Sequence, residues 1–347
     1  MDSRERVFRA FNFKEADKVP AWFGSSPEFL QKAMNALNMD EEGVRKRFGD
    51  DFRRVYGVYQ EPGYQVSKTA TWKSPFGVER IGIGFGQPTT HPLKDITTVK
   101  EAFDYYSPNP DWVNVSNIKN DADKYHREFA ILGGDWSPFW HDAVDLFGME
   151  ELFIKMYEYP EVVKTVIDQI VNYYYVVNEH IFDAAGDSID VFFIGNDFGS
   201  QTGPLLGIDL FSEFLLPSLK KLIDLGHSYN HKVMLHCCGS IRLLLPLMIE
   251  AGLDGIHPLQ PDCYGMEPSK LKKDFGDKIL LNGGIDSHNI LINGKSDYVK
   301  RETIRILDIM APGGGYVAGA SHDYILEETP FENVLAMFDA ISEYQLA

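Results

Sequence analysis

The sequence predicts an α/β fold, a single (β/α)8 TIM barrel with a β-hairpin insertion near the N-terminus. From residue 130 onward, short apolar strands alternate with helical segments at least six times. Buried strands that alternate with helices favour parallel pairing. No strand leads into the glycine-rich turn of a dinucleotide-binding sheet. With a strand near the N-terminus the count approaches eight, so a closed barrel is favoured over an open sheet.

The N-terminal part supplies the first helix and the first strand. Residues 2–13 form an amphipathic helix pattern, and residues 17–22 are typical of a turn that leads into a short strand. Two helices are predicted at 27–38 and 41–48. Aromatic residues and glycines then alternate through residues 52–93, which is typical of β-hairpins.

The remaining chain fits one domain that spans residues 1–347. The predicted barrel strands are 130–134, 190–195, 232–235, 254–256, 278–281 and 315–318. The predicted helices are 99–105, 121–128, 138–157, 160–185, 209–228, 240–251, 268–275, 296–310 and 330–343. We find no linker, internal repeat or low-complexity segment that would divide the chain.

Composition excludes several classes of partner. Lys and Arg total 33 against 51 Asp and Glu, a net charge of −18. Such an acidic chain is a poor ligand for nucleic acid. No apolar run approaches the ~20 residues of a membrane span, and the charged N-terminus is unlike a signal peptide. The 3 cysteines cannot make a disulfide framework, so a reducing, cytoplasmic location is expected.

Polar residues follow the predicted strands, where the active site of such a barrel is built. They are Asp135, Asn196, Asp197, His236, Cys238, His257, Asn282 and His322. The most informative are His236 and Cys238, because imidazole and thiolate together suit Zn²⁺. A catalytic zinc site needs a third protein ligand. We expect His322, with Cys263, Asp197 and Glu267 as alternatives. The other interpretation is that Cys238 is a small core residue and that His236 binds a buried carbonyl.

Other strand-end residues are candidates for the reaction and for the substrate pocket. Asp197 is expected to act as a general acid or base or to orient a histidine ligand, with Gln201 beside it; a helix cap and turn is the alternative. The loop that carries Trp136 and Trp140 can wall a pocket for a flat substrate or pack in the core. The remaining pocket candidates are Asn196, His257, Gln260 and Asn282.

Several segments resemble the uroporphyrinogen decarboxylase superfamily. They are residues 3–20 (SRERVFRAFNFKEADKVP), 195–223, 236–240 (HCCGS), 251–261 (AGLDGIHPLQP) and 329–340 (TPFENVLAMFDA). Their order and spacing cover almost the whole chain. The resemblance implies a single-domain (β/α)8 barrel.

The chain differs from true decarboxylases in ways that make it resemble the other branch of the superfamily more closely. True decarboxylases carry an arginine-rich segment after the first strand, whereas residues 21–27 here contain no arginine. The other branch comprises methyltransferases that work with methyl-corrinoid proteins and bind Zn²⁺ through H-x-C and a later cysteine. His236 and Cys238 match the first two positions. Residues 319–322 contain no cysteine, so His322 is expected to replace it.

The sequence therefore predicts a zinc-dependent methyltransferase that moves a methyl group between a small substrate, such as a methoxy compound, and a corrinoid on a separate protein. The alternatives are a metal-independent lyase of the decarboxylase kind, with Asp197 as the polar catalyst, and a binding barrel without activity. The resemblance also implies a homodimer.

Overall fold

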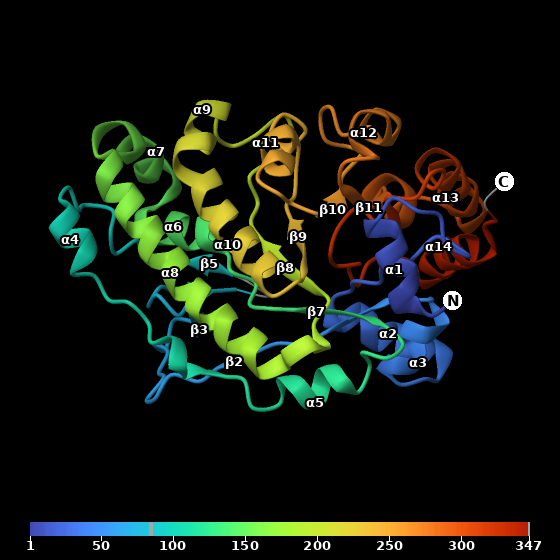
Figure 1. Cartoon of the computed structure of the whole chain (residues 1–347), viewed down its shortest axis with the longest axis horizontal. Coiled ribbons are helices and arrows are strands. Elements are labelled where there is room, and N and C mark those ends of the chain that lie inside the picture. The colour runs from blue at the N-terminus through green and yellow to red at the C-terminus, as the bar shows by residue number, and fades with distance from the viewer. Residues whose placement is uncertain (83–85, 346–347) are drawn as a thin grey trace.

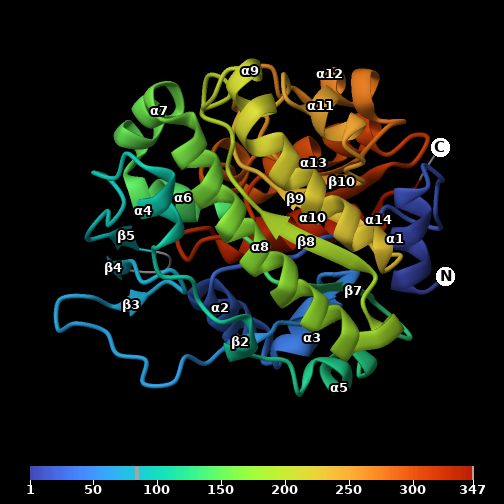
Figure 2. The same ribbon diagram turned by 60° about the vertical axis from the view of Figure 1, so that its left-hand side comes forward.

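The computed structural model describes residues 1–82 and 86–345 and is built around one parallel sheet (Figures 1 and 2). Its seven strands lie in the order β1-β7-β8-β9-β10-β11-β12. They are β1 (Phe52–Arg54), β7 (Ala130–Gly133), β8 (Val191–Gly195), β9 (Lys232–His236), β10 (Gly255–Leu259), β11 (Leu280–Ile285) and β12 (Tyr316–Ala320). Except at Arg54 and Lys232, every residue of these strands is buried, as expected for parallel strands covered on both faces.

The predicted eighth strand is reduced to single bridges at Ala21. This residue forms parallel bridges with both Asp50 and Ala318. Asp50 lies just before β1 and Ala318 lies in β12, and these are the two edge strands of the sheet. Trp22 N donates to Ala318 O at 2.9 Å, and Asp51 N donates to Ala21 O at 3.0 Å. The two edges are thus joined through one residue, and we refer to the joined sheet as the barrel.

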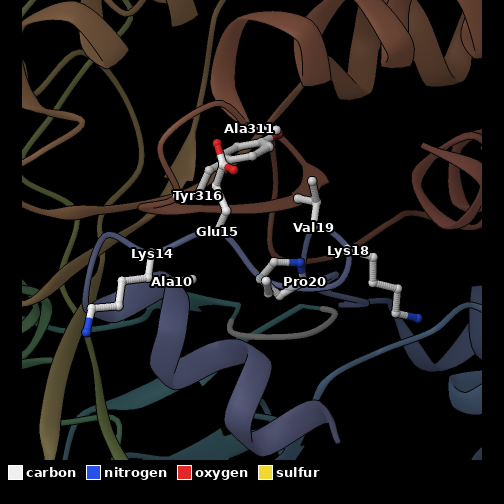
Figure 3. A pocket seen from close by; sticks show the side chains of 10 residues that line it. Ala10, Lys14, Glu15, Lys18, Val19, Pro20, Ala311 and Tyr316 are labelled. Carbon is white, nitrogen blue, oxygen red and sulfur yellow. The ribbon is translucent and has the colours of Figure 1, made fainter. Parts of the chain in front are cut away.

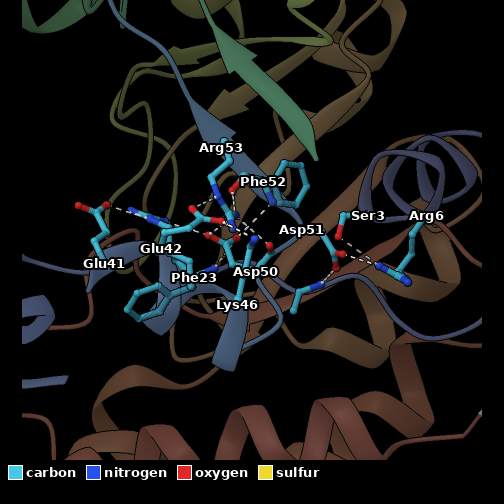
Figure 4. A network of polar contacts seen from close by, with 12 residues as sticks. Ser3, Arg6, Phe23, Glu41, Glu42, Lys46, Asp50, Asp51, Phe52 and Arg53 are labelled. Carbon is cyan, nitrogen blue, oxygen red and sulfur yellow. Dashed lines mark hydrogen bonds and ion pairs between the residues drawn. The ribbon is translucent and has the colours of Figure 1, made fainter. Parts of the chain in front are cut away.

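Two buried carboxylates hold this closing segment, as Figure 4 shows. Asp51 accepts hydrogen bonds from Ala21 N at 2.8 Å and from Arg6 Nη1 at 2.5 Å. Asp50 accepts from Phe23 N at 3.3 Å and pairs with an arginine of the preceding helix. In a full strand these backbone N–H groups would donate to a neighbouring strand, whereas here they donate to the two carboxylates.

We expect Asp51→Asn to destabilise the protein by about 3–5 kcal/mol, because it leaves the buried Arg6 guanidinium without its innermost counter-charge. Urea denaturation measures the loss. Asp17→Asn is the matched control, since Asp17 pairs with the same arginine at the surface, where such pairs contribute about 0–1 kcal/mol. Equal losses in the two variants would show that Asp51 does not hold the closure.

Helices cover the outside of the barrel. They are α1 (Ser3–Phe11), α2 (Pro27–Leu37), α3 (Glu41–Arg47), α4 (Val99–Phe103), α5 (Ile118–Asp123), α6 (Phe139–Phe147), α7 (Met149–Glu158), α8 (Pro160–Ala185), α9 (Ile208–Leu210), α10 (Leu216–Ser228), α11 (Leu245–Glu250), α12 (Pro268–Phe275), α13 (Ser296–Met310) and α14 (Phe331–Glu343). The predicted helix at 138–157 is divided at Gly148, whose φ of 80° breaks the helix into α6 and α7. The predicted helix at 209–228 contains a wider turn at Phe211–Leu215, which precedes Pro217.

The amino end of the barrel is closed by α1. Val7, Ala10 and Phe11 belong to the same buried cluster as the inward side chains Leu132, Phe193, Met234 and Leu280. Figure 3 shows a small cavity beside the end of α1, next to Tyr316. Its volume of about 10 Å³ is room for about one water. The opposite end, where the strands have their carboxyl ends, is the one at which barrels of this kind build their sites, and we call it the mouth.

Three predicted strands end later than expected. The sequence placed their ends at 256, 281 and 318, but β10, β11 and β12 continue to Leu259, Ile285 and Ala320. Polar residues interrupt the apolar runs there, because the inward positions near the mouth face the site. The backbone hydrogen bonds between the strands continue past these residues. His257 and Asn282 consequently lie within strands.

The predicted hairpin segment is only partly hairpin. Phe52–Arg54 is β1 of the barrel itself. Three short strands, β3 (Trp72–Lys73), β4 (Glu79–Ile81) and β5 (Gln87–Pro88), form a separate antiparallel sheet, which is drawn on the left of Figure 2. The last pair is β2 (Val58–Tyr59) with β6 (Val113–Asn114). Residues 83–85 of the predicted segment lie outside the described residues.

None of the described helices is both long enough and apolar enough to cross a bilayer.

Candidate metal centre

The loops after β8 and β9 meet backbone to backbone at the mouth. Gly239 has a φ of 89°, and a Cβ on it would lie 2.5 Å from the carbonyl carbon of Gly199. A Cβ on Gly199 would in turn lie 2.6 Å from Cys238 O. Only glycines permit this approach. It brings the residues that follow β8 beside those that follow β9, although they are about 40 positions apart in the chain.

Asp197, His236 and Cys238 consequently form one cluster, with a possible ligand atom from each within 4.8 Å of the others. His236 Nε2 lies 3.4 Å from Cys238 Sγ and 3.6 Å from Asp197 Oδ1. Cys238 N donates to Asp197 Oδ1 at 2.7 Å, which fixes the carboxylate. One thiolate, one imidazole and one carboxylate are a donor set that Zn²⁺ accepts, with a fourth position left open.

The electrostatics of the three groups differ. Burial opposes ionisation of Asp197, but the contacts with His141 and His236 and the Cys238 N–H outweigh it and hold the pKa of this carboxyl below its usual range. Burial raises the pKa of the Cys238 thiol, and the negative charge of Asp197 raises it further. Burial lowers the pKa of His236. Without metal the cluster therefore holds a carboxylate, a thiol and a neutral imidazole.

A second cluster adjoins the first at His236. It contains His236, His257 and Asp323, all buried. His236 Nδ1 lies 3.2 Å from His257 Nδ1, and His257 Nε2 lies 3.8 Å from Asp323 Oδ1. Arg54 Nη2 approaches the same carboxylate oxygen to 2.8 Å. Because Arg54 already neutralises Asp323, a cation is less favourable here than in the first cluster.

Aromatic rings enclose both clusters. The ring of Trp136 lies 5.0 Å from that of His236, and the ring of Trp22 lies 4.5 Å from that of His257. Phe193 packs between them, against Trp136 and Trp22. Trp136 reaches this place because residue 195 is glycine; a Cβ there would lie 1.8 Å from the indole. The surroundings of the two clusters are thus aromatic around a few polar atoms, a composition that small-molecule sites often have.

The sequence profile of uroporphyrinogen decarboxylase (URO-D) matches residues 115–344. The chain belongs to the URO-D family. The predicted resemblance is confirmed.

Several relatives of this URO-D family chain carry methyltransferase names. A methylcobamide:CoM methyltransferase MtbA of Methanosarcina acetivorans is 22% identical over 360 residues, which cover 99% of this chain and 98% of the relative. A methylcobamide:CoM methyltransferase MtaA of Methanosarcina barkeri is 32% identical, over 40% of this chain and 38% of its own. A uroporphyrinogen decarboxylase of Rickettsia africae is 27% identical over 48% of this chain and 45% of its own.

A solved structure has the same fold along the full length. The methyltransferase from Methanosarcina mazei superimposes with a TM-score of 0.71 at 21% sequence identity, over 99% of both chains. The curled parallel sheet and its covering helices are therefore arranged as in that solved structure.

The structure brings only part of the predicted site of this URO-D family chain together. His236, Cys238, Asp197, His257 and Trp136 converge at the mouth. His322 belongs to neither cluster of the described residues; its Nδ1 accepts a hydrogen bond from Tyr324 N at 3.1 Å.

Three other predicted residues pack or hydrogen-bond around the loops that carry the site. Trp140 is buried and stacks on Phe153, so it does not line the mouth. Asn196 is fully buried and joins the loop after β7, accepting from Trp140 N at 2.9 Å. Gln260 accepts a hydrogen bond from Gly239 N.

The remaining four predicted residues lie outside the metal cluster. Gln201 Oε1 lies 3.4 Å from Cys263 Sγ, so these two residues contact each other. Asn282 is buried in the barrel, with its Nδ2 3.9 Å from Met234 Sδ. Glu267 pairs with Lys270 at the start of α12.

Two residues of the site, Arg54 and Asp323, were not predicted as functional, and the contact of His141 with Asp197 was not predicted either. Asp323 lies three residues after the last strand, next to His322, which was chosen instead. Arg54 ends β1, inside the segment interpreted as hairpins. His141 belongs to α6, and its Nε2 lies 3.4 Å from Asp197 Oδ2, a contact between a helix and a loop that no local pattern reveals.

Proposed function

We propose that this protein is a zinc-dependent methyltransferase that moves a methyl group between a small substrate and a corrinoid carried by a separate protein. The observation that carries the proposal is the convergence of Asp197, His236 and Cys238 at the mouth of the barrel. The full-length similarity to a methylcobamide:CoM methyltransferase supports the reaction class.

The chain's own residues define how the centre works. Cys238 Sγ, His236 Nε2 and one oxygen of Asp197 would hold the ion. Bound zinc would supply a Lewis acid that polarises the heteroatom which gains or loses the methyl group. The other oxygen of Asp197 faces His141 Nε2, so this pair can hold a proton next to the reacting atoms. The rings of Trp136 and Phe193 exclude water and position a small, flat or apolar substrate, for which a methoxy compound is our expectation.

Exposed apolar side chains on the loops that follow four barrel strands support a protein-borne corrinoid. Tyr56 follows β1, Leu243 follows β9, Tyr264 follows β10, and Tyr324 follows β12. Large exposed apolar groups at one end of the barrel are the kind of side chain that protein-binding surfaces use. The corrinoid partner would dock there, above the metal cluster.

The alternative is a lyase that releases carbon dioxide from a carboxylated substrate, which the match to a decarboxylase favours. The charges at the mouth argue against it. Arg54 is the cation that ends β1, and it is already paired with Asp323. A substrate with many carboxylates would have to compete with Asp197 and Asp323 for it.

An assay with free methylcobalamin tests the proposed reaction. The zinc-loaded protein is incubated with methylcobalamin and a thiol or phenol acceptor, and the loss of the cobalt–carbon bond is followed by absorbance. We expect demethylation that is faster than without protein and that stops when a chelator removes the metal. Carbon dioxide release from a porphyrinogen by the metal-free protein would favour the lyase.

Zinc affinity is expected to rise with pH, by about tenfold per unit between pH 6 and 8. The sign follows from the thiol. The pKa of Cys238 is raised by burial, so the thiol is protonated in this range and must lose its proton to bind zinc. The pKa of His236 is lowered, so the imidazole releases none. Competition with a chelator of known pH dependence measures the slope. The Cys238→Ala variant should show a flat profile, and a flat profile in the wild type would contradict the assignment.

A further inference from the structure

We infer that Asp323 is a specificity-determining residue, which makes the mouth accept uncharged methoxy-aromatic substrates and exclude their anionic counterparts. The inference rests on the proposed function, because it concerns the substrate of the same centre. It assigns a role to the ion pair of Asp323 with Arg54, which the proposed metal centre does not use.

The ion pair of Arg54 and Asp323 lies beside the metal cluster. An oxygen of Asp323 is within 4.8 Å of a ring nitrogen of His236, which is one of the proposed ligands. The Arg54 guanidinium lies over the rings of Trp22 and Phe193, at 4.7 and 5.1 Å from their centres. A flat substrate that reacts at the metal cluster therefore lies within a few Å of both charges.

Asp323 occupies the part of Arg54 that would bind an anion. Arg54 Nη2 donates to Asp323 Oδ1 at 2.8 Å, and Arg54 Nη1 donates to Asp323 Oδ2 at 3.4 Å. This two-point fork is the geometry with which arginine binds a carboxylate. Asp323 is buried, so a substrate carboxylate would have to displace a charged side chain that is already desolvated and paired.

The groups at the mouth offer no net positive charge to an anion. Without metal, and with the histidines neutral, the carboxylates of Asp197 and Asp323 outnumber the guanidinium of Arg54. Bound zinc would be balanced by Cys238 and Asp197, which leaves Arg54 balanced by Asp323. The whole chain adds a net charge of −18. An anion is therefore repelled or left unpaired in either state, whereas an uncharged ligand avoids both costs.

Uncharged polar atoms near the ion pair favour a neutral polar ligand. Trp22 Nε1, a donor, and Asn282 Oδ1, an acceptor, have no hydrogen-bond partner among the described residues, although both side chains are buried. The Trp22 ring lies 4.5 Å from that of His257 in β10, and Asn282 lies in the neighbouring strand β11. Buried polar atoms normally have a partner, and an ether, hydroxyl or amide group can supply one without adding charge.

Two ligands of the same shape test the inference in the wild-type protein. They are 4-methoxybenzamide and 4-methoxybenzoate, which differ by one charge. Isothermal titration calorimetry at neutral pH measures the affinity of the full-length protein for each. We expect the amide to bind at least about tenfold more tightly, the effect of one unpaired unit charge at the edge of a protein. A wild type that binds the benzoate as tightly as the amide, or that binds neither, would overturn the inference.

The Asp323→Asn variant tests the residue itself, because asparagine keeps the shape of the side chain and leaves the guanidinium of Arg54 unneutralised. We expect the affinity for the benzoate to rise about tenfold and the affinity for the amide to change less than about threefold. The gain should disappear in the double variant Arg54→Gln/Asp323→Asn, which lacks the cation as well. An affinity for the benzoate that does not rise in Asp323→Asn, or that rises equally in the double variant, would contradict the role of Asp323.

Asp190→Asn is the matched control, because Asp190 is a buried aspartate that pairs with Arg4 at 2.8 Å, just before β8 at the other end of the barrel. It removes the same charge and should leave both affinities unchanged. An equal gain for the benzoate in this variant would assign the preference to the net charge of the chain and overturn the inference. A protein with the expected preference that does not demethylate methylcobalamin would contradict the proposed function and leave the charge selectivity of the mouth standing. Demethylation by a protein that prefers the benzoate would do the reverse.

Discussion

The Cys238→Ala and His236→Ala proteins are expected to bind Zn²⁺ more than 100-fold more weakly than the wild type. Loss of an outer partner of a ligand costs about 10–100-fold in affinity, so loss of a ligand itself should cost more. Zinc content after purification without chelators, followed by competition with a coloured chelator, measures both. The loss should be accompanied by loss of methyl transfer.

The neighbouring cysteine is the control for this experiment. Cys237 is fully buried, whereas Cys238 is partly exposed, and the sulfur of Cys237 accepts a hydrogen bond from Phe198 N at 3.2 Å. Cys237→Ala should keep its zinc. If it loses zinc as Cys238→Ala does, the effect comes from disturbed packing rather than from a lost ligand.

The Asp197→Asn protein is expected to lose about 10–100-fold in zinc affinity, whereas His322→Gln should change it less than about threefold. Asparagine preserves the shape of the aspartate and can still accept the hydrogen bond from Cys238 N, but it brings no charge to the ion. His322 lies outside the cluster and is occupied with the backbone of Tyr324. The same chelator competition compares the two variants.

This pair of variants decides the third ligand. A large loss in His322→Gln with little change in Asp197→Asn would restore the ligand expected from the sequence. It would also require the loop after β12 to move, since His322 is held there by Tyr324.

The fold followed from the sequence wherever the signal was local. Apolar runs followed by helices located β7 to β12 within a few residues, whereas β1 was interpreted as part of the hairpins. The closing strand expected within residues 17–22 is instead a single bridged residue, Ala21, that is held by the carboxylate of Asp51. No pattern of period two exists in a strand of that length.

The site divides in the same way. His236 and Cys238 were predictable because both lie at one strand end and have ligand chemistry. The partnership of Arg54 with Asp323 joins positions 269 residues apart, and only closure of the barrel makes them neighbours. The sequence offered Asp197 only as an alternative to His322, because Asp197 lies far from Cys238 along the chain. The glycine contact between the loops after β8 and β9 brings Asp197 to Cys238, and it is a backbone feature that a sequence pattern does not display.

The most direct test of the central claim is X-ray absorption at the zinc edge of the wild-type protein. A site built from Cys238, His236 and Asp197 predicts one sulfur neighbour at about 2.3 Å, with the remaining nitrogen and oxygen neighbours at about 2.0–2.2 Å. Two sulfur neighbours would bring a second cysteine into the site, and none would remove Cys238 from it. Either result, or a protein that holds no zinc at all, would contradict the account.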